Sequence, residues 1–191
     1  MNFFAANFRE NKVFAKSLEL FCYFAIIFAV IFNNFSLHHD LAANQYAQTK
    51  VYYSKTSQPD LELVRAIQDA DKYVYFAIYT VTKENIANAL IAAKLRGLDV
   101  RGVMDYKQTL IDQEKPRLSK FKKYGIEIKV PFKLDGLMHI KMLVTDKAYA
   151  SGSFNWTVAA ATYNDDILEI GEVQGIRNQY LQAFWDLWAR S

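Results

Sequence analysis

The spacing of apolar residues changes several times over residues 49–191. Runs rich in Val, Ile and aromatic residues predict strands, and the first three are Lys50–Tyr53, Lys72–Thr80 and Asp99–Asp105. Positions with helical spacing separate these runs, one set opened by Pro59 and another over Glu84–Arg96. Alternating strands and helices of this kind predict an α/β fold with a largely parallel sheet.

The second half of the chain continues this alternation. We expect Pro116 to open a helix, Met138–Asp146 to form a buried strand, and Asp165–Ile170 to form another. The same spacing predicts which helix positions face the core: Leu61, Val64 and Ile67–Ala70, then Leu118 and Phe121, and in a closing helix Ile176, Tyr180, Phe184 and Leu187. A short helix is expected over Trp156–Tyr163, just after an Asn.

The first 48 residues have a different character. Residues 1–17 are a basic segment, and no charged residue occurs from Leu20 to Leu37. About 18 such residues can cross a bilayer as a helix, so residues 18–37 predict a transmembrane anchor or a signal segment. An anchor is favoured because the apolar run is long and no Ala-x-Ala cleavage site follows it. Residues 38–48 predict a polar linker, and residues 49–191 a catalytic domain.

Composition narrows the function classes only a little. The net charge of +3 is too mild to argue for nucleic acid by itself. The single cysteine excludes an intramolecular disulfide and a cysteine-based zinc cluster. There is no glycine-rich phosphate loop, so a nucleotide-binding Rossmann or P-loop domain has no support.

The candidate chemistry lies around residue 140. His139 and Lys141 are two positions apart in an apolar run, so on a strand they share one face. A lone His there is usually a packed core residue, and a lone Lys usually lies at an edge. Here, however, a turn carrying Ser153 and Asn155 follows. Lys supplies positive charge, Ser and Asn supply neutral donors, and His can attack or move a proton, so the joint pattern predicts a phosphate site.

These residues resemble the HKD signature of the phospholipase D superfamily, His-x-Lys-x4-Asp-x6-Gly-Ser-x-Asn. The chain has five rather than six residues between Asp146 and Gly152, which we interpret as a shortened hairpin turn. Other segments resemble the single-motif bacterial Nuc-type endonucleases, namely Phe76–Thr82, Ala92–Val100 and Gly152–Thr157. The resemblance covers roughly Thr49–Arg190 and implies a phospholipase D-like mixed β-sheet with helices on both faces.

The resemblance also implies roles for the site residues. His139 would be the nucleophile, and Lys141 and Asn155 would hold the phosphate with help from Ser153. Asp146 belongs to the catalytic motif and is expected to orient its neighbours. Relatives usually carry Glu where Asp166 stands, so Asp166 is assigned as a supporting acid. No metal or other cofactor is implied, and family members with one motif work as homodimers with a shared active site.

A basic segment, Lys107–Lys133, suggests a partner. Lys120, Lys122 and Lys123 are expected on the outer face of its helix. Such a face is usually only solvated, but it could also bind a polyanion through backbone contacts.

Two functions therefore stay open: a membrane-tethered endonuclease acting on DNA or RNA, and a lipid hydrolase acting on a phospholipid. A third, less favoured alternative is a membrane-anchored binding protein with a retired site. Basic residues before the apolar span place the catalytic domain outside the cytoplasm, on the periplasmic side of a bacterial membrane. The alternative is secretion after signal cleavage.

Overall fold

The structure, a computed structural model, describes residues 21, 23–33, 48–131 and 136–191. The chain divides into two units, Met1–Tyr46 and Ala47–Ser191. In the first unit residues 23–33 are helical. No helix in the described ranges is both long and apolar enough to cross a bilayer. The predicted span over residues 18–37 lies partly outside these ranges, as does most of the linker over residues 38–48, so both stay predictions.

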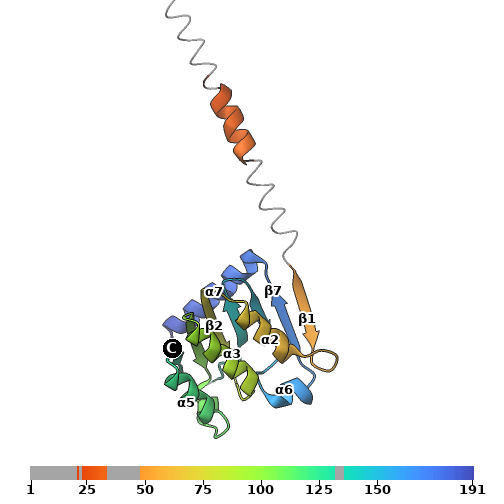
Figure 1. Cartoon of the computed structure of the whole chain (residues 1–191), viewed down its shortest axis with the longest axis vertical. Helices are drawn as coiled ribbons and strands as arrows, with labels where there is room; N and C mark the ends of the chain where they lie inside the picture. The colour runs from red at the N-terminus through yellow and green to blue at the C-terminus, as the bar shows by residue number, and fades with distance from the viewer. Residues whose placement is uncertain (1–20, 22, 34–47, 132–135) are drawn as a thin grey trace, which may run out of the picture. The chain divides into compact units, whose positions relative to one another are not determined.

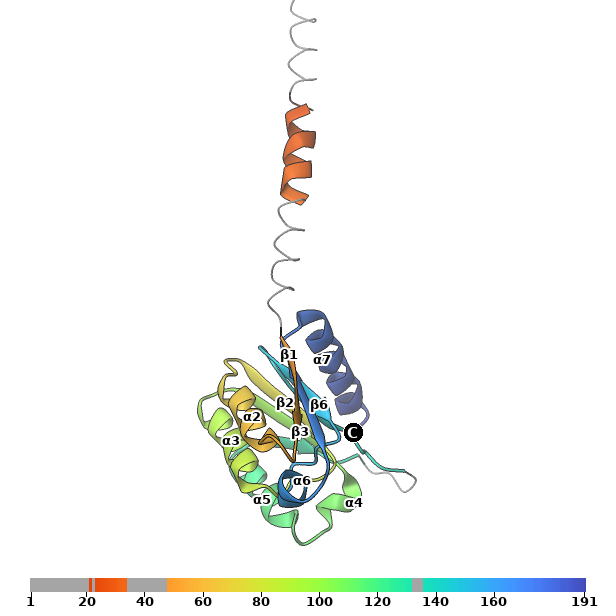
Figure 2. The same cartoon turned by 90° about the vertical axis from the view of Figure 1, so that its right-hand side faces the viewer.

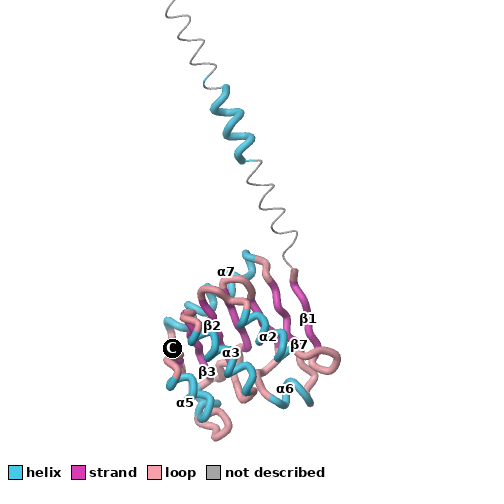
Figure 3. The backbone as a smooth tube through the Cα atoms, in the orientation of Figure 1, coloured by secondary structure: helices cyan, strands magenta, loops and turns pink. Residues whose placement is uncertain are grey.

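The second unit is built on one mixed sheet. Its described residues contribute seven strands in the order β1-β7-β6-β5-β2-β3-β4. Their bounds are β1 Thr49–Tyr53, β2 Tyr73–Ile78, β3 Asp99–Met104, β4 Glu127–Lys129, β5 Lys141–Thr145, β6 Tyr149–Gly152 and β7 Ile167–Gly171. Strands β2, β3 and β4 are parallel, whereas β5, β6, β7 and β1 pair in antiparallel fashion. The strands lie side by side in one layer (Figure 3). The predicted α/β class is confirmed, and the sheet is mixed.

Helices cover both faces of this sheet, as expected. Most of them lie on one face and α7 lies on the other (Figures 1 and 2). Their bounds are α2 Pro59–Gln68, α3 Glu84–Leu95, α4 Tyr106–Thr109, α5 Lys115–Lys123, α6 Val158–Thr162 and α7 Gln174–Ala189. The two faces bury separate apolar clusters, one around Phe76 and Trp156 and the other around Tyr75 and Phe184. Burial of these large side chains stabilises the sheet from both sides.

Three details differ from the sequence predictions. Strand β5 begins at Lys141, so His139 precedes the strand and does not lie on it. On α2 the buried apolar positions include Leu63 and not Leu61, because the helix presents a face one residue away from the predicted one. On α7 Ile176 is exposed, while Phe184 and Leu187 are buried as expected.

The shortened hairpin is confirmed. Val144 pairs with Tyr149 across the turn, and the Thr145 amide donates to the Ala148 carbonyl at 2.8 Å. The Thr145 hydroxyl oxygen accepts from the amides of Lys147 and Ala148 at 3.1 and 2.9 Å. Because the side chain closes the turn in this way, the connection needs few residues.

Candidate active site

The motif residues meet at one edge of the sheet because of strand directions. Ile78 ends β2 and pairs with Lys141 at the start of β5, and it pairs with Met104 at the end of β3. Gly152 ends β6 and pairs with Leu168 near the start of β7. The segments that follow β2, β3 and β6, and those that precede β5 and β7, therefore lie at the same edge, which we call the site edge.

Lys141 is the buried cation of this edge, with 6% of its surface exposed. Its Nζ donates to the backbone carbonyl of His139 at 2.9 Å and lies 5.0 Å from the centre of the Tyr79 ring. Burial lowers the pKa of Lys141, and the nearby Asp166 carboxylate opposes that shift. An ammonium has three N–H donors, so two remain for a phosphate group.

His139 lies beside this ammonium on an exposed segment. Its imidazole packs against the ring of Tyr79, with the centroids 4.6 Å apart and the planes at 64°. The imidazole of His139 and the ammonium of Lys141 thus contact the same side chain, that of Tyr79. The predicted grouping of His139 with Lys141 is observed, although His139 is not on the strand.

Ser153, Asn155 and Asp166 lie on the neighbouring segments of the site edge. The Ser153 hydroxyl donates to Asp166 Oδ1 at 2.7 Å and accepts from the Ile167 amide at 3.1 Å. Asn155 precedes Trp156, whose amide donates to the Thr80 carbonyl at 3.2 Å beyond the end of β2. Asn155 Oδ1 and Asp166 Oδ2 are buried without a hydrogen-bond partner among the described residues. Buried polar atoms are normally paired, so these two oxygens are exceptions at the site edge.

Gly152 explains why Ser153 can reach Asp166. Its φ is +149°, and a Cβ at this position would lie 2.1 Å from the Ile167 carbonyl oxygen. Only glycine allows the two backbones to approach this closely.

Asp146, in contrast, is not brought to the site edge. It follows the far end of β5, so about 16 Å of strand separates it from Lys141. Its Oδ1 accepts from the amides of Asp71 and Lys72 at 3.1 and 3.2 Å. Burial acts to raise the pKa of Asp146, but these backbone hydrogen bonds outweigh it and the pKa is lowered. The geometry corrects the expectation that Asp146 orients the catalytic groups: it fixes the turn before β2.

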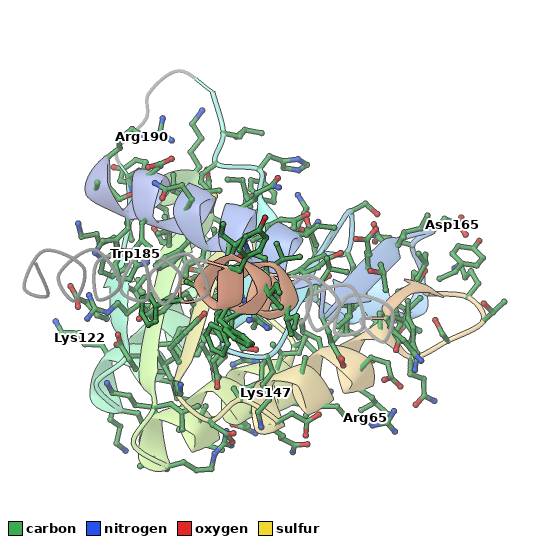
Figure 4. All side chains as sticks on the ribbon, turned by 90° about the horizontal axis from the view of Figure 1, so that it is seen from above. Arg65, Lys122, Lys147, Asp165, Trp185 and Arg190 are labelled. Atoms are coloured by element: carbon green, nitrogen blue, oxygen red, sulfur yellow. The ribbon has the colours of Figure 1, made fainter. Side chains whose placement is uncertain are left out.

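The predicted polyanion-binding lysines lie on α5 and are not grouped with the motif residues. The Lys120 ammonium is paired with Glu84 and with Asn88 Oδ1, the latter at 2.8 Å. Lys122 and Lys123 are exposed in the last turn of α5. The chain then enters β4, whose first residue, Glu127, pairs with Arg101 in the middle of β3. Figure 4 shows Lys122 and Asp165, the neighbour of Asp166, on opposite sides of the domain.

Four residues at the site edge were not assigned from the sequence: Tyr79, Asp105, Gln108 and Glu114. Gln108 Nε2 donates to the Tyr79 hydroxyl at 2.8 Å. The buried carboxylate of Glu114 accepts from the Thr80 hydroxyl and from the Val81 amide, and burial is the main cause of its raised pKa. Tyr79 and Asp105 come directly after β2 and β3, and this position is the signal that could have found them, because functional side chains gather at the carboxyl ends of parallel strands.

Comparison with known proteins identifies the class to which this fold and site belong. The family model described as "Cardiolipin synthase, PLD-like domain" matches residues 63–188. The chain therefore belongs to the phospholipase D superfamily through this PLD-like domain.

Individual relatives agree with this assignment. The chain is 31% identical over 121 residues to a protein of Rickettsia conorii named "Phospholipase D", covering 63% of this chain but only 59% of that protein. Among solved structures it is similar to the phospholipase D family member Nuc from Salmonella typhimurium, with 26% identity, a TM-score of 0.70, and coverage of 75% of this chain and 95% of Nuc. NucT from Helicobacter pylori shares the fold at 22% identity and a TM-score of 0.69, with coverage of 75% of this chain and 97% of NucT.

Proposed function

We propose that the chain is a phosphodiesterase, a hydrolase that acts as a sequence-nonspecific endonuclease on DNA or RNA. The observation that carries this proposal is the grouping of His139, Lys141, Ser153, Asn155 and Asp166 at one edge of the sheet. The likeness to Nuc, at 26% identity over most of both chains, supports a nuclease. The family match and the name of the Rickettsia relative agree with a phosphodiesterase of the phospholipase D superfamily.

In the proposed mechanism His139 attacks phosphorus and the bond to the leaving oxygen breaks, which leaves a phosphohistidine. A second histidine protonates the leaving oxygen and then removes a proton from the water that hydrolyses the intermediate. Lys141 and Asn155 hold the non-bridging oxygens, where negative charge accumulates in the transition state. Ser153 is placed to contact the phosphate, and Asp166 holds Ser153.

The second histidine is proposed to come from a second copy of the chain. A single motif supplies one histidine, and a two-fold axis through the site edge would bring in another. Exposed apolar side chains on the segments that flank the site support such an interface. These side chains, the apolar rim, are Leu110, Ile111, Leu137, Ile140, Val158, Tyr163 and Ile167. Where exposed apolar side chains form one patch, they mark an interaction site.

A lipid hydrolase acting on a phospholipid is the second candidate. The apolar rim favours it, since acyl chains could contact the rim while the phosphate reaches Lys141. The lysines of α5 give the nuclease no extra support, because Lys120 is paired with Glu84 and Lys122 lies on the side of the domain opposite to Asp165 (Figure 4). The name "Phospholipase D" of the Rickettsia relative agrees with this candidate.

One experiment separates these functions. The purified full-length protein in detergent, and its His139→Ala variant, would be incubated with plasmid, single-stranded DNA, RNA and phospholipid vesicles. We expect nucleic acid to be cut by the wild type and not by the variant. Release of head groups from vesicles without nicking of plasmid would instead support the lipase. Cleavage by His139→Ala at the wild-type rate would exclude the proposed nucleophile.

The same assay tests metal independence. Within the described part of the chain no group of three His, Cys, Asp or Glu side chains could hold a metal ion. Since Lys141 and Asn155 are proposed to neutralise the phosphate, we expect activity to survive excess EDTA. Loss of activity in EDTA and its rescue by magnesium would contradict this mechanism.

We also propose that residues 18–37 tether the protein to a membrane, with the catalytic domain on the extracytoplasmic, periplasmic side. The uncharged run from Leu20 to Leu37 after a basic segment supports a tether. The full-length protein should then stay with membranes after a carbonate wash and keep its N-terminus. A soluble mature product that starts near Asn44 would show that the segment is a cleaved signal.

A further inference from the structure

The imidazole of His139 has little that holds it in place. His139 is exposed and precedes β5. Among the described residues no hydrogen bond to its ring nitrogens is observed, and its ring contact is with Tyr79, at 4.6 Å. A nucleophile needs an orientation fixed by neighbouring side chains, because small misplacements reduce the rate strongly. Tyr79, which contacts the imidazole, is therefore the residue that can fix its orientation.

Tyr79 is itself held at both ends. Its amide donates to the Ile140 carbonyl at 2.8 Å, which joins the end of β2 to the segment carrying His139. Its hydroxyl accepts from Gln108 Nε2 at 2.8 Å. The aromatic ring is thus fixed both at its backbone and at its far end, unlike the imidazole that it contacts.

Asp105 closes this arrangement. It is 3% exposed, and its two carboxylate oxygens serve different segments. Oδ1 accepts from the Gln108 amide at 3.1 Å and caps α4, while Oδ2 accepts from the Met138 amide at 2.9 Å, next to His139. Hydrogen bonds from backbone amides to a buried carboxylate are among the stronger hydrogen bonds in proteins.

The Tyr79 ring also contacts the second catalytic group. Lys141 Nζ lies 5.0 Å from the ring centre, within the range of a cation–π interaction. One rigid ring therefore contacts both the imidazole and the ammonium, so it can set the distance between nucleophile and phosphate-binding cation.

We propose that Tyr79, held by Gln108, is a positioning residue that orients the His139 imidazole relative to Lys141. This role rests on the proposed phosphodiesterase function but is not part of it. The ring supplies the orientation, and the hydrogen bond from Gln108 supplies rigidity. Asp105 fixes the two backbone segments between which the ring lies.

The test uses the full-length protein and a chromogenic bis-aryl phosphodiester, so that it does not depend on the natural substrate. Tyr79→Leu should lower kcat about 100-fold and change KM less than about threefold, because orientation and not binding is lost. Tyr79→Phe keeps the ring and should lose only about fivefold. The matched control is Tyr124→Leu, which removes an exposed tyrosine whose ring also lies near a lysine ammonium, at 5.8 Å, and which should keep the wild-type kcat.

A double-mutant cycle tests the hydrogen bond. Gln108→Leu should lower kcat about fivefold, as Tyr79→Phe does, and the double variant should be no worse than either single variant, because both remove the same bond. Gln182→Leu, which removes an exposed glutamine that donates to Asp186, is the control. Losses that multiply in the double variant would overturn the assigned link, even if Tyr79→Leu failed to fold.

A spectroscopic measurement separates this proposal from the proposed function. In wild type and Tyr79→Phe the His139 ring protons should show a ring-current shift in histidine-selective NMR, and Tyr79→Leu should remove it. If the wild type cleaves no phosphodiester, the proposed function fails while the spectra still decide whether Tyr79 orients His139. A His139 spectrum that is the same in all three proteins would overturn the positioning role.

Discussion

At the scale of single residues, Lys141 shows how burial and chemistry conflict. Its ammonium is desolvated, which favours the neutral form and lowers its pKa, yet the proposed mechanism needs the positive charge. Asp166 nearby opposes the shift. A phosphate dianion or diester would oppose it further. Free enzyme should therefore be more sensitive to alkaline pH than the enzyme with substrate bound.

This difference can be measured. Since the protonated amine is the active form and its pKa is lowered, kcat/KM should fall on the alkaline side at a pH below the ordinary lysine value of about 10.5. Lys141→Arg should lower the rate but remove this alkaline loss, because a guanidinium does not deprotonate in this range. An alkaline limb at the same pH in both proteins would assign it to another group.

At the scale of elements, β5 carries motif residues with unrelated tasks at its two ends. Lys141 starts the strand at the site edge, and Asp146 follows its other end and accepts two backbone amides. The sequence spacing predicted the strand and the hairpin, since both depend on local apolar pattern and turn chemistry. The spacing could not predict which end of β5 lies at the site edge, because that depends on the pairing of β5 with β2.

Asp146→Ala should therefore damage stability and not catalysis. Two amides would lose their acceptor, which costs about 1–3 kcal/mol in the free energy of unfolding. Because the folded-state pKa of Asp146 is lowered, its stabilisation is present above the unfolded value of about 3.8 and disappears as pH falls through the folded-state pKa. Urea unfolding at several pH values should show the gap between wild type and variant narrowing below about pH 4. A loss of kcat above about tenfold in the folded variant would return Asp146 to the catalytic group.

Helix α5 gives an element-level prediction on substrate binding. Lys122 and Lys123 end the helix, and Lys122 lies on the side of the domain opposite to Asp165 (Figure 4). Reversing both to Glu should change kcat/KM on plasmid less than about threefold at moderate salt, because screening weakens charges beyond a Debye length. Lys141→Ala is the comparison that should abolish cleavage. A steep, salt-dependent loss in the double reversal would show that a polyanion does reach this helix.

At the scale of the whole molecule, the sequence predicted the class of fold but not which distant segments pair. Alternating strands and helices were visible locally, and Phe184 and Leu187, expected to face the core, are buried against the sheet. The antiparallel return of β5 beside β2, and the contact of Tyr79 with His139, depend on pairing between distant segments. The apolar rim is assembled from segments that follow β3 and β6, the segment that precedes β5 and the first residue of β7, so no single stretch of sequence displays it.

Mixing two kinds of subunit tests whether the active site is shared. If each site needs His139 from both copies, a dimer of one wild-type and one His139→Ala subunit should be nearly inactive. Co-refolding equal amounts gives random pairing, so about a quarter of the dimers would be fully wild type and the activity would fall as the square of the wild-type fraction. Independent monomeric sites would give a straight line, with about half the activity at equal mixing. The control is a mixture of wild type with Tyr124→Leu, which should keep full activity at every ratio. The rate is measured against mutant fraction at fixed total protein, and a straight line would reject the shared site whatever the natural substrate is.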